Sequence, residues 1–240
     1  MMDQSSNKPH ALKPPEALMR AIAQDLSPVK PSPQPFHLAL RMIPLALLVS
    51  SLALLAMGPR HDLKILGALL TWGASAAQFV LAIALVWIAG HESMPAGRLP
   101  RQMVYSAAVV ASLVVVLVTL LTFSASPASE PLRMGRLPVS PLIMGLACGI
   151  GSTLTGGILV LLFSRVFRNS LATRPTVAGA LYGAGAGLAI NAGWRIACPL
   201  SVPWHALGAH GAAIIATVIL GALIGRLLGN RRLRIGDGRS

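Results

Sequence analysis

Charge is scarce in this sequence, and negative charge is the scarcest. Charged side chains make up 11% of the 240 residues, with seven Asp or Glu against twenty Lys or Arg. Soluble domains carry about 25% charged residues. With 54% hydrophobic residues and a mean hydropathy of +0.68, the composition predicts an integral membrane protein and argues against a soluble domain.

Cysteine is nearly missing as well, which excludes two further classes. The chain has two cysteines, Cys148 and Cys198, too few for a disulfide scaffold or a four-cysteine zinc site. The first 35 residues are polar and rich in proline, without the basic start and short apolar core of a signal peptide. We therefore expect no cleaved signal.

The motifs of catalysis and ion transport are also missing. No phosphate-cradling loop, zinc-protease helix or nucleophile elbow occurs. Transporters and pumps mark their paths with charges inside the membrane, but the middles of the long apolar runs hold none. We expect no enzyme, and a small membrane carrier or channel subunit remains the alternative function. Gln78 and Asn191 are the most polar groups inside the runs, and each is expected to form an interhelical hydrogen bond.

Six apolar runs are long enough to span a bilayer, which takes about 20 helical residues. They lie near 39–57, 65–89, 102–123, 142–163, 176–197 and 206–228. The sequence therefore predicts an all-α integral membrane protein. It consists of an amino-terminal tail (1–38), a six-transmembrane-helix bundle (39–228) and a basic carboxyl tail (229–240).

The basic residues predict the orientation of this bundle. Fifteen of the twenty lie in the two tails, in the even-numbered connections, or, like Arg41 and Arg226, at the tail-side ends of the first and sixth runs; the other five are Arg60, Lys64, Arg133, Arg136 and Arg195. Lys and Arg collect on the cytoplasmic side of membrane proteins. Both termini are therefore expected in the cytoplasm. No basic stripe with interleaved aromatic residues is present, so direct nucleic-acid binding is not expected.

The amino-terminal tail contains a predicted amphipathic helix at about 14–27, within "PPEALMRAIAQDLSPVKP". Leu18, Ile22 and Leu26 lie four residues apart on one face. A helix of this length is marginal alone in water, so it needs a surface to bind. Its polar face carries a single cation, Arg20, whereas membrane-surface helices usually carry several. This favours a partner protein over the lipid surface.

Glycine repeats at four-residue spacing mark the fifth and sixth runs. They are Gly179, Gly183 and Gly187, and Gly221, Gly225 and Gly229. Small residues at this spacing let two helices approach closely in lipid. We expect these faces to pack against neighbouring helices, and a homo-oligomer formed through them is a further expectation.

The connection between the fifth and sixth runs collects reactive side chains, in "NAGWRIACPLSVPWHALGAHG" at residues 191–211. Trp194 and Trp204 are expected to be anchors at the membrane interface. Cys198 lies at the outer end of the fifth run, whereas Cys148 lies about 9 Å, or six residues, into the fourth. A disulfide needs Cα atoms within about 7 Å, so pairing requires the fourth span to start higher or to tilt.

Three interpretations of the cysteines remain open. They are buried as small hydrophobic groups, or they form a thiol pair at the outward face that reacts with oxidants or soft metals. In the third, they form a metal site together with two histidines near the start of the sixth run; its ligands would be Cys148, Cys198, His205 and His210. No resident cofactor is expected, although transient heavy-metal binding fits these residue types.

Two motifs and the six runs together resemble the NrsF family, six-span inner-membrane anti-sigma factors of proteobacteria. The motifs are Asp-Leu-x-Pro-Val-basic-Pro, here Asp25 to Pro31, and Cys-Pro…Trp-His, here Cys198 to His205. The resemblance covers residues from about 15 to 228. One departure is that Leu200 and Ser201 stand where family members often carry acidic residues, so no carboxylate is offered there to a metal.

The resemblance implies a regulator of transcription in the bacterial inner membrane that takes part in a stress response. Its amino tail holds an extracytoplasmic-function sigma factor inactive, and a periplasmic signal, a metal or an oxidant, releases that factor. The tail residues carried over are Leu18, Ile22, Asp25, Leu26, Pro28 and Val29. The candidate sensors of the signal are Cys148 and Cys198.

Overall fold

The computed structural model describes residues 15–25, 34–94, 99–126, 133–134, 137–138, 140–168 and 173–237. The chain divides into two units, Met1–Pro31 and Ser32–Ser240. The first unit contains helix α1 (Glu16–Asp25), which begins directly after Pro15. The Pro15 carbonyl accepts hydrogen bonds from the backbone N–H groups of Leu18 and Met19. The tail helix is thus present within the bounds expected for it.

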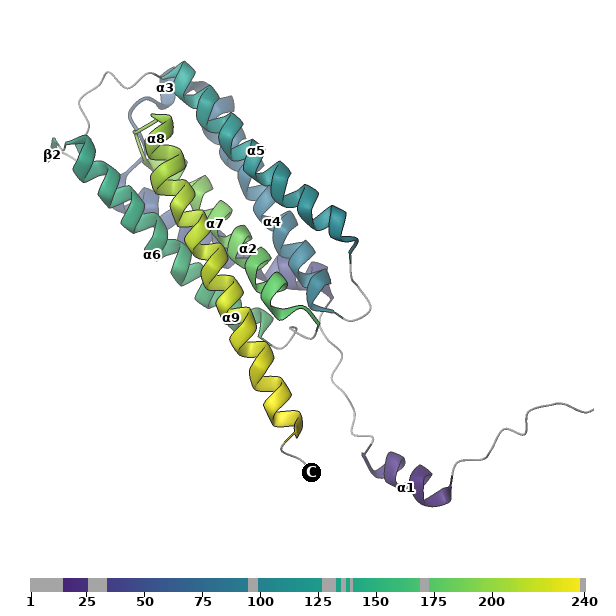
Figure 1. Cartoon of the computed structure of the whole chain (residues 1–240). Coiled ribbons are helices and arrows are strands. Elements are labelled where there is room, and N and C mark those ends of the chain that lie inside the picture. The colour runs from purple at the N-terminus through teal and green to yellow at the C-terminus, as the bar shows by residue number, and fades with distance from the viewer. Residues whose placement is uncertain are drawn as a thin grey trace, which may run out of the picture. The chain divides into compact units, whose positions relative to one another are not determined.

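The second unit is a bundle of helices (Figure 1). Its elements are α2 (Pro35–Met57), α3 (Leu63–Ala68), the π-helical turn η1 (Leu69–Gly73), α4 (Ala74–Ser93), α5 (Arg101–Ala125), a two-stranded antiparallel hairpin of β1 (Arg133–Met134) and β2 (Leu137–Pro138), α6 (Pro141–Phe167), α7 (Pro175–Ala197), α8 (Pro203–His205), the π-helical turn η2 (Ala206–His210) and α9 (Gly211–Asp237). Proline occupies the first position of four of these helices, where its missing N–H costs no hydrogen bond.

Five helical segments among the described residues are long and apolar enough to cross a membrane. They are Pro35–Met57, Leu63–Ser93, Arg101–Ala125, Pro141–Phe167 and Pro203–Asn230. The remaining expected span, α7, is not among them, because glycine, alanine and Asn191 make it less apolar. It is instead the most enclosed helix, with 17 of its 23 residues buried. It contacts α2, α4, α6 and α9 and runs through the centre of the bundle (Figure 1).

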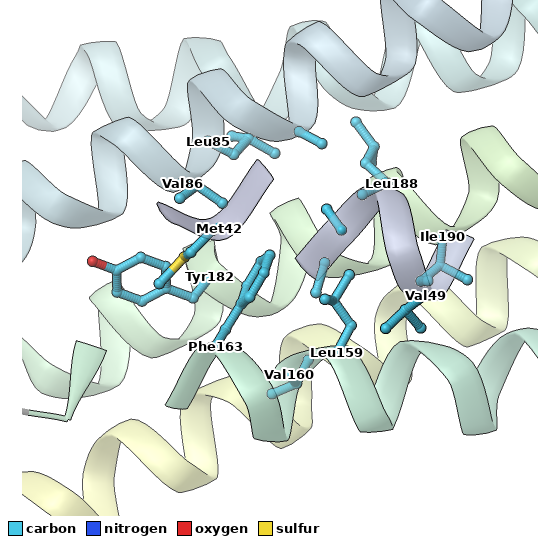
Figure 2. Packing of buried hydrophobic residues seen from close by; sticks show 14 of the residues in the cluster. Met42, Val49, Leu85, Val86, Leu159, Val160, Phe163, Tyr182, Leu188 and Ile190 are labelled. Carbon is cyan, nitrogen blue, oxygen red and sulfur yellow. The ribbon is translucent and has the colours of Figure 1, made fainter. Parts of the chain in front are cut away.

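The core forms around α7, where side chains from α2, α4 and α6 meet (Figure 2). Phe163 of α6 and Tyr182 of α7 are among its largest fully buried members. One polar contact lies inside the bundle, where the Asn191 amide donates a hydrogen bond to Gln78 Oε1 at 2.8 Å. Each of these residues was expected to form an interhelical hydrogen bond. They form it with each other, between α4 and α7.

The two glycine repeats face each other inside one chain. A Cβ atom built on Gly183 would lie 2.1 Å from the Thr217 carbonyl oxygen, and one on Gly179 would lie 2.2 Å from that of Gly221. Only hydrogen fits at these positions, so α7 and α9 touch backbone to backbone. Because this contact occupies the glycine faces, they do not offer the surface for a homo-oligomer that the sequence suggested.

The Gly183→Ala substitution tests this contact. The added methyl must push α9 away, and we expect a loss of about 1–3 kcal/mol in unfolding free energy, as for overpacking in a core. Gly157→Ala on α6 is the matched control, because its Cβ would meet no atom closer than 3.8 Å. Thermal unfolding in one detergent compares the two variants. Equal midpoints would contradict the close α7–α9 packing.

Candidate functional site

The proposed sigma-factor-binding residues are only partly described. Leu18 lies on α1 with 50% of its surface exposed, and Met19 beside it is 53% exposed. Ile22 and Asp25 also lie on α1, although only their place in the helix is described. The other three predicted residues, Leu26, Pro28 and Val29, lie outside the described residues. The described part of the tail thus presents two half-exposed apolar side chains, Leu18 and Met19.

The structure brings the four candidate metal ligands into one buried cluster. One potential ligand atom from each of Cys148, Cys198, His205 and His210 lies within 4.8 Å of the other three. The two sulfur atoms are 3.1 Å apart, and the Cys198 sulfur lies 3.3 Å from His205 Nε2. None of the four residues is more than 6% exposed. The expected depth difference between the two cysteines does not separate their side chains.

A π-helical turn aligns the two histidines. Five residues of α-helix would rotate His210 about 140° away from His205. In η2 the chain closes hydrogen bonds to the fifth residue instead, which widens the turn. The two imidazole rings consequently meet edge to face, with centroids 5.1 Å apart. Sequence spacing alone did not reveal this turn, which makes the two histidines neighbours.

Trp194 of α7 lies beside the cluster, with its ring centroid 6.2 Å from that of His210. Its predicted role as an anchor at the membrane interface is wrong. It is 5% exposed, and its indole Nε1 donates a hydrogen bond to Thr155 Oγ1 at 3.2 Å. Its ring fills the space left by Gly151, whose Cβ would lie 2.5 Å from it. Trp204, by contrast, is 67% exposed, as a side chain facing lipid or the interface would be.

The donor set fits a soft or borderline metal ion. Around a tetrahedral zinc ion, sulfur and nitrogen ligands lie about 3.3–3.8 Å from one another, so small side-chain movements would suffice here. His205 Nδ1 and His210 Nδ1 are buried without a hydrogen-bond partner among the described residues, and such orphaned polar atoms call for a ligand. Both thiols are free. A hydrogen bond from Cys148, together with contacts to His205 and His210, lowers the pKa of the Cys198 thiol against the effect of burial.

Arg60 holds the loop that carries Cys198. Its backbone N–H donates to the Ile196 carbonyl at 2.9 Å. Its guanidinium donates to Ser201 Oγ at 2.6 Å and to the carbonyls of Arg195 and Pro199, both at 3.5 Å. The arginine is 5% exposed. Sequence reasoning counted it as an outward loop charge, whereas the structure makes it the bridge between the end of α2 and the cysteine loop.

Asp62 completes this bridge and neutralises its charge. Its carboxylate pairs with the Arg60 guanidinium and accepts a hydrogen bond from Ser126 Oγ at 2.6 Å. Burial raises the pKa of Asp62, but the hydrogen bonds from Arg60 and Ser126 outweigh that effect and lower it below 3.8. The aspartate is therefore ionised, and it ties the end of α5 to the same network.

Breaking this pair should destabilise the bundle. Arg60→Gln leaves the Asp62 carboxylate buried without its cation, which costs about 3–5 kcal/mol in comparable pairs. The Arg60→Gln/Asp62→Asn double variant removes both charges and should recover part of that loss. Because the folded-state pKa of Asp62 is lowered, its contribution is present above the unfolded pKa and is lost as pH falls through the folded pKa, below about 4. Unfolding midpoints against pH measure both effects. Equal midpoints for wild type and Arg60→Gln would contradict the bridge.

Fold and site together define a helical membrane protein with a buried thiol–imidazole cluster at one end of its bundle and a separate amphipathic helix ahead of it. A family model described as "NrsF: Negative regulator of sigma F" matches residues 22–230. The chain belongs to the NrsF family, so it is a negative regulator whose partner is a sigma factor. Comparison with curated proteins and with solved structures gave no significant match.

Proposed function

We propose that this protein is an inner-membrane anti-sigma factor that holds an extracytoplasmic-function sigma factor through its amino tail and releases it on a periplasmic signal. The signal is a metal or an oxidant, received at the cluster of Cys148, Cys198, His205 and His210. The observation that carries the sensor assignment is this buried cluster, whose potential ligand atoms lie within 4.8 Å of one another. Membership of the NrsF family indicates a sigma factor as the partner.

The membrane topology proposed for this function has six spans, with both termini in the cytoplasm. The five apolar segments form the lipid-facing spans, and α7 is the sixth, enclosed by them. The excess of Lys and Arg in the tails and the even-numbered connections supports this orientation. The cluster then lies near the periplasmic side, because Cys198 follows the outer end of α7.

Helix α2 offers a route from the sensor to the tail. Its first residue, Pro35, closely follows the tail in the chain, and it ends at Met57, just before the Arg60 bridge. Along its length the Ser50 hydroxyl donates to the Ala189 carbonyl at 2.9 Å, which joins α2 to α7. A ligand that rearranges the Cys198 loop would therefore shift Arg60 and, through α2, the base of the tail.

Metal binding can supply the free energy needed to release the sigma factor. Changing a partner from nearly fully bound to nearly fully released takes about 5.5 kcal/mol of differential stabilisation. Structural zinc sites with thiolate ligands bind with about 10–16 kcal/mol, so part of that energy suffices. An alternative carrier function gains no support, because the buried charges of the described residues lie near helix ends and the polar contacts between helices farther inside, such as the Gln78–Asn191 pair, are uncharged.

The tail assignment predicts the effect of a charge on its apolar face. Leu18→Asp in the full-length protein should weaken binding of the purified sigma factor at least about tenfold, because the apolar contact is replaced by a solvated carboxylate. Ala17→Asp adds the same charge to the other side of α1 and is the control. Affinity is measured by titration in nanodiscs. Equal affinities of the two variants would contradict binding through this face.

The sensor assignment predicts a metal-binding phenotype for all four residues. Cadmium serves as the probe, because cadmium–thiolate absorbance reports binding directly. Cys148→Ser, Cys198→Ser, His205→Ala and His210→Ala should each lower cadmium affinity at least about tenfold, since each removes a ligand. His61→Ala, an exposed histidine outside the cluster, should bind as wild type.

Release of the sigma factor is then measured in the same samples. Cadmium should release it from the wild type and from His61→Ala, but not from either cysteine variant. Cadmium binding without release would contradict the proposed signalling while leaving the metal site intact. Absence of cadmium binding, with release by an oxidant that depends on both cysteines, would assign the signal to thiol oxidation.

A further inference from the structure

A small polar cavity adjoins the cysteine–histidine cluster, and Cys198 and His210 form part of its wall. Its volume is about 30 Å³, and its lining includes Arg60, Thr122, Asn191, Arg195, Ser201 and His210. Such a lining is unusual in a bundle whose other internal contacts are mainly apolar. The cavity brings together α5, α7, η2 and the loop after Cys198.

Arg195 is one of two arginines in this lining. Its guanidinium donates to the Leu70 carbonyl at 2.9 Å and to Thr122 Oγ1 at 3.0 Å, and both acceptors are neutral. Its Nε is buried and has no hydrogen-bond partner among the described residues. His210, which is 6% exposed, lines the same cavity with an unpartnered Nδ1. Two buried nitrogen atoms around this cavity are therefore unsatisfied.

No carboxylate in the described part of the bundle neutralises Arg195. The carboxylates whose side chains the structure describes there are those of Asp62, which pairs with Arg60, and Glu92, which pairs with Arg174 at 3.2 Å. The Arg60 charge in the cavity wall is therefore cancelled, whereas that of Arg195 is not. Arg195 is partly buried, and even partial loss of water around an unpaired guanidinium is unfavourable; charges inside membrane proteins are normally paired.

We propose that this cavity binds a small inorganic anion, which supplies the missing counter-charge of Arg195. A cavity needs about 10–15 Å³ to hold one water molecule, so the present one accommodates an ion of about the size of chloride and excludes large organic anions. Arg195 Nε, which has no other partner among the described residues, would donate to that ion. The cavity shares Cys198 and His210 with the proposed metal site, so chloride binding is tested without added metal.

Chloride is the probe for the test, with gluconate as the oversized anion that keeps ionic strength constant. The full-length protein is reconstituted in nanodiscs without added metal, and its thermal midpoint is followed as chloride replaces gluconate. At about five times the dissociation constant, chloride should raise the wild-type midpoint by roughly 2–4 °C. Arg195→Gln should remove this dependence, and Arg195→Lys should retain part of it. Arg165→Gln, on α6 and away from the cavity lining, should respond as wild type.

Direct binding keeps the test decisive if Arg195→Gln fails to fold. Chloride-35 NMR line broadening by the wild-type protein should be reduced by bromide, which competes for the site, and not by gluconate. A wild-type midpoint that is the same in chloride and gluconate, without line broadening, would overturn the proposal. A chloride response that persists in folded Arg195→Gln would also overturn it, because the ion would then bind elsewhere.

Discussion

The backbone contact between α7 and α9 is the constraint on which the rest of the bundle depends. Lipid provides little hydrophobic force to hold helices together, so close packing must do so. Gly183 and Gly221 let the two helices approach until carbonyl oxygens lie where side chains would be. This close contact fixes α7 in the centre of the bundle. It also sets the position of the Cys198 loop, which follows α7, relative to η2, which directly precedes α9.

Buried ion pairs connect the helices at both ends of the bundle. At one end, Arg60 and Asp62 join α2, α5 and the Cys198 loop. At the other, the Glu92 carboxylate, which is fully buried, accepts from Arg174 at 3.2 Å and from the Leu99 backbone at 3.3 Å. Both pairs satisfy the hydrogen-bonding groups that burial would otherwise leave costly. The described buried ion pairs thus lie where helices meet their connections, whereas the polar contacts along the bundle, such as Asn191–Gln78, are uncharged.

The sequence identified the four candidate ligands of the cluster, but it did not show how the fold brings them together. Cysteine and histidine are recognisable from residue chemistry, so Cys148, Cys198, His205 and His210 were identifiable as candidate ligands. Their meeting depends on the π-helical turn and on the direction of side chains from α6, which residue spacing does not encode. Trp194 was misplaced for a similar reason: a tryptophan near a helix end is commonly an interface anchor, but Gly151 opens a buried space for its ring.

Composition and periodicity alone determined that this is a helical membrane protein with an amphipathic tail, because lipid requires long apolar helices and excludes other spanning folds. The motifs at Asp25–Pro31 and Cys198–His205 already suggested the family. Tertiary structure decided which polar groups are buried together. Arg60 and Arg195 look alike in the sequence as loop and helix-end charges, yet one pairs with a carboxylate and the other lines a cavity without one. The Arg60–Asp62 pair is only two residues apart, but the contacts of Arg60 with Ser201 and of Arg195 with Leu70 join residues more than 100 positions apart, which no local pattern records.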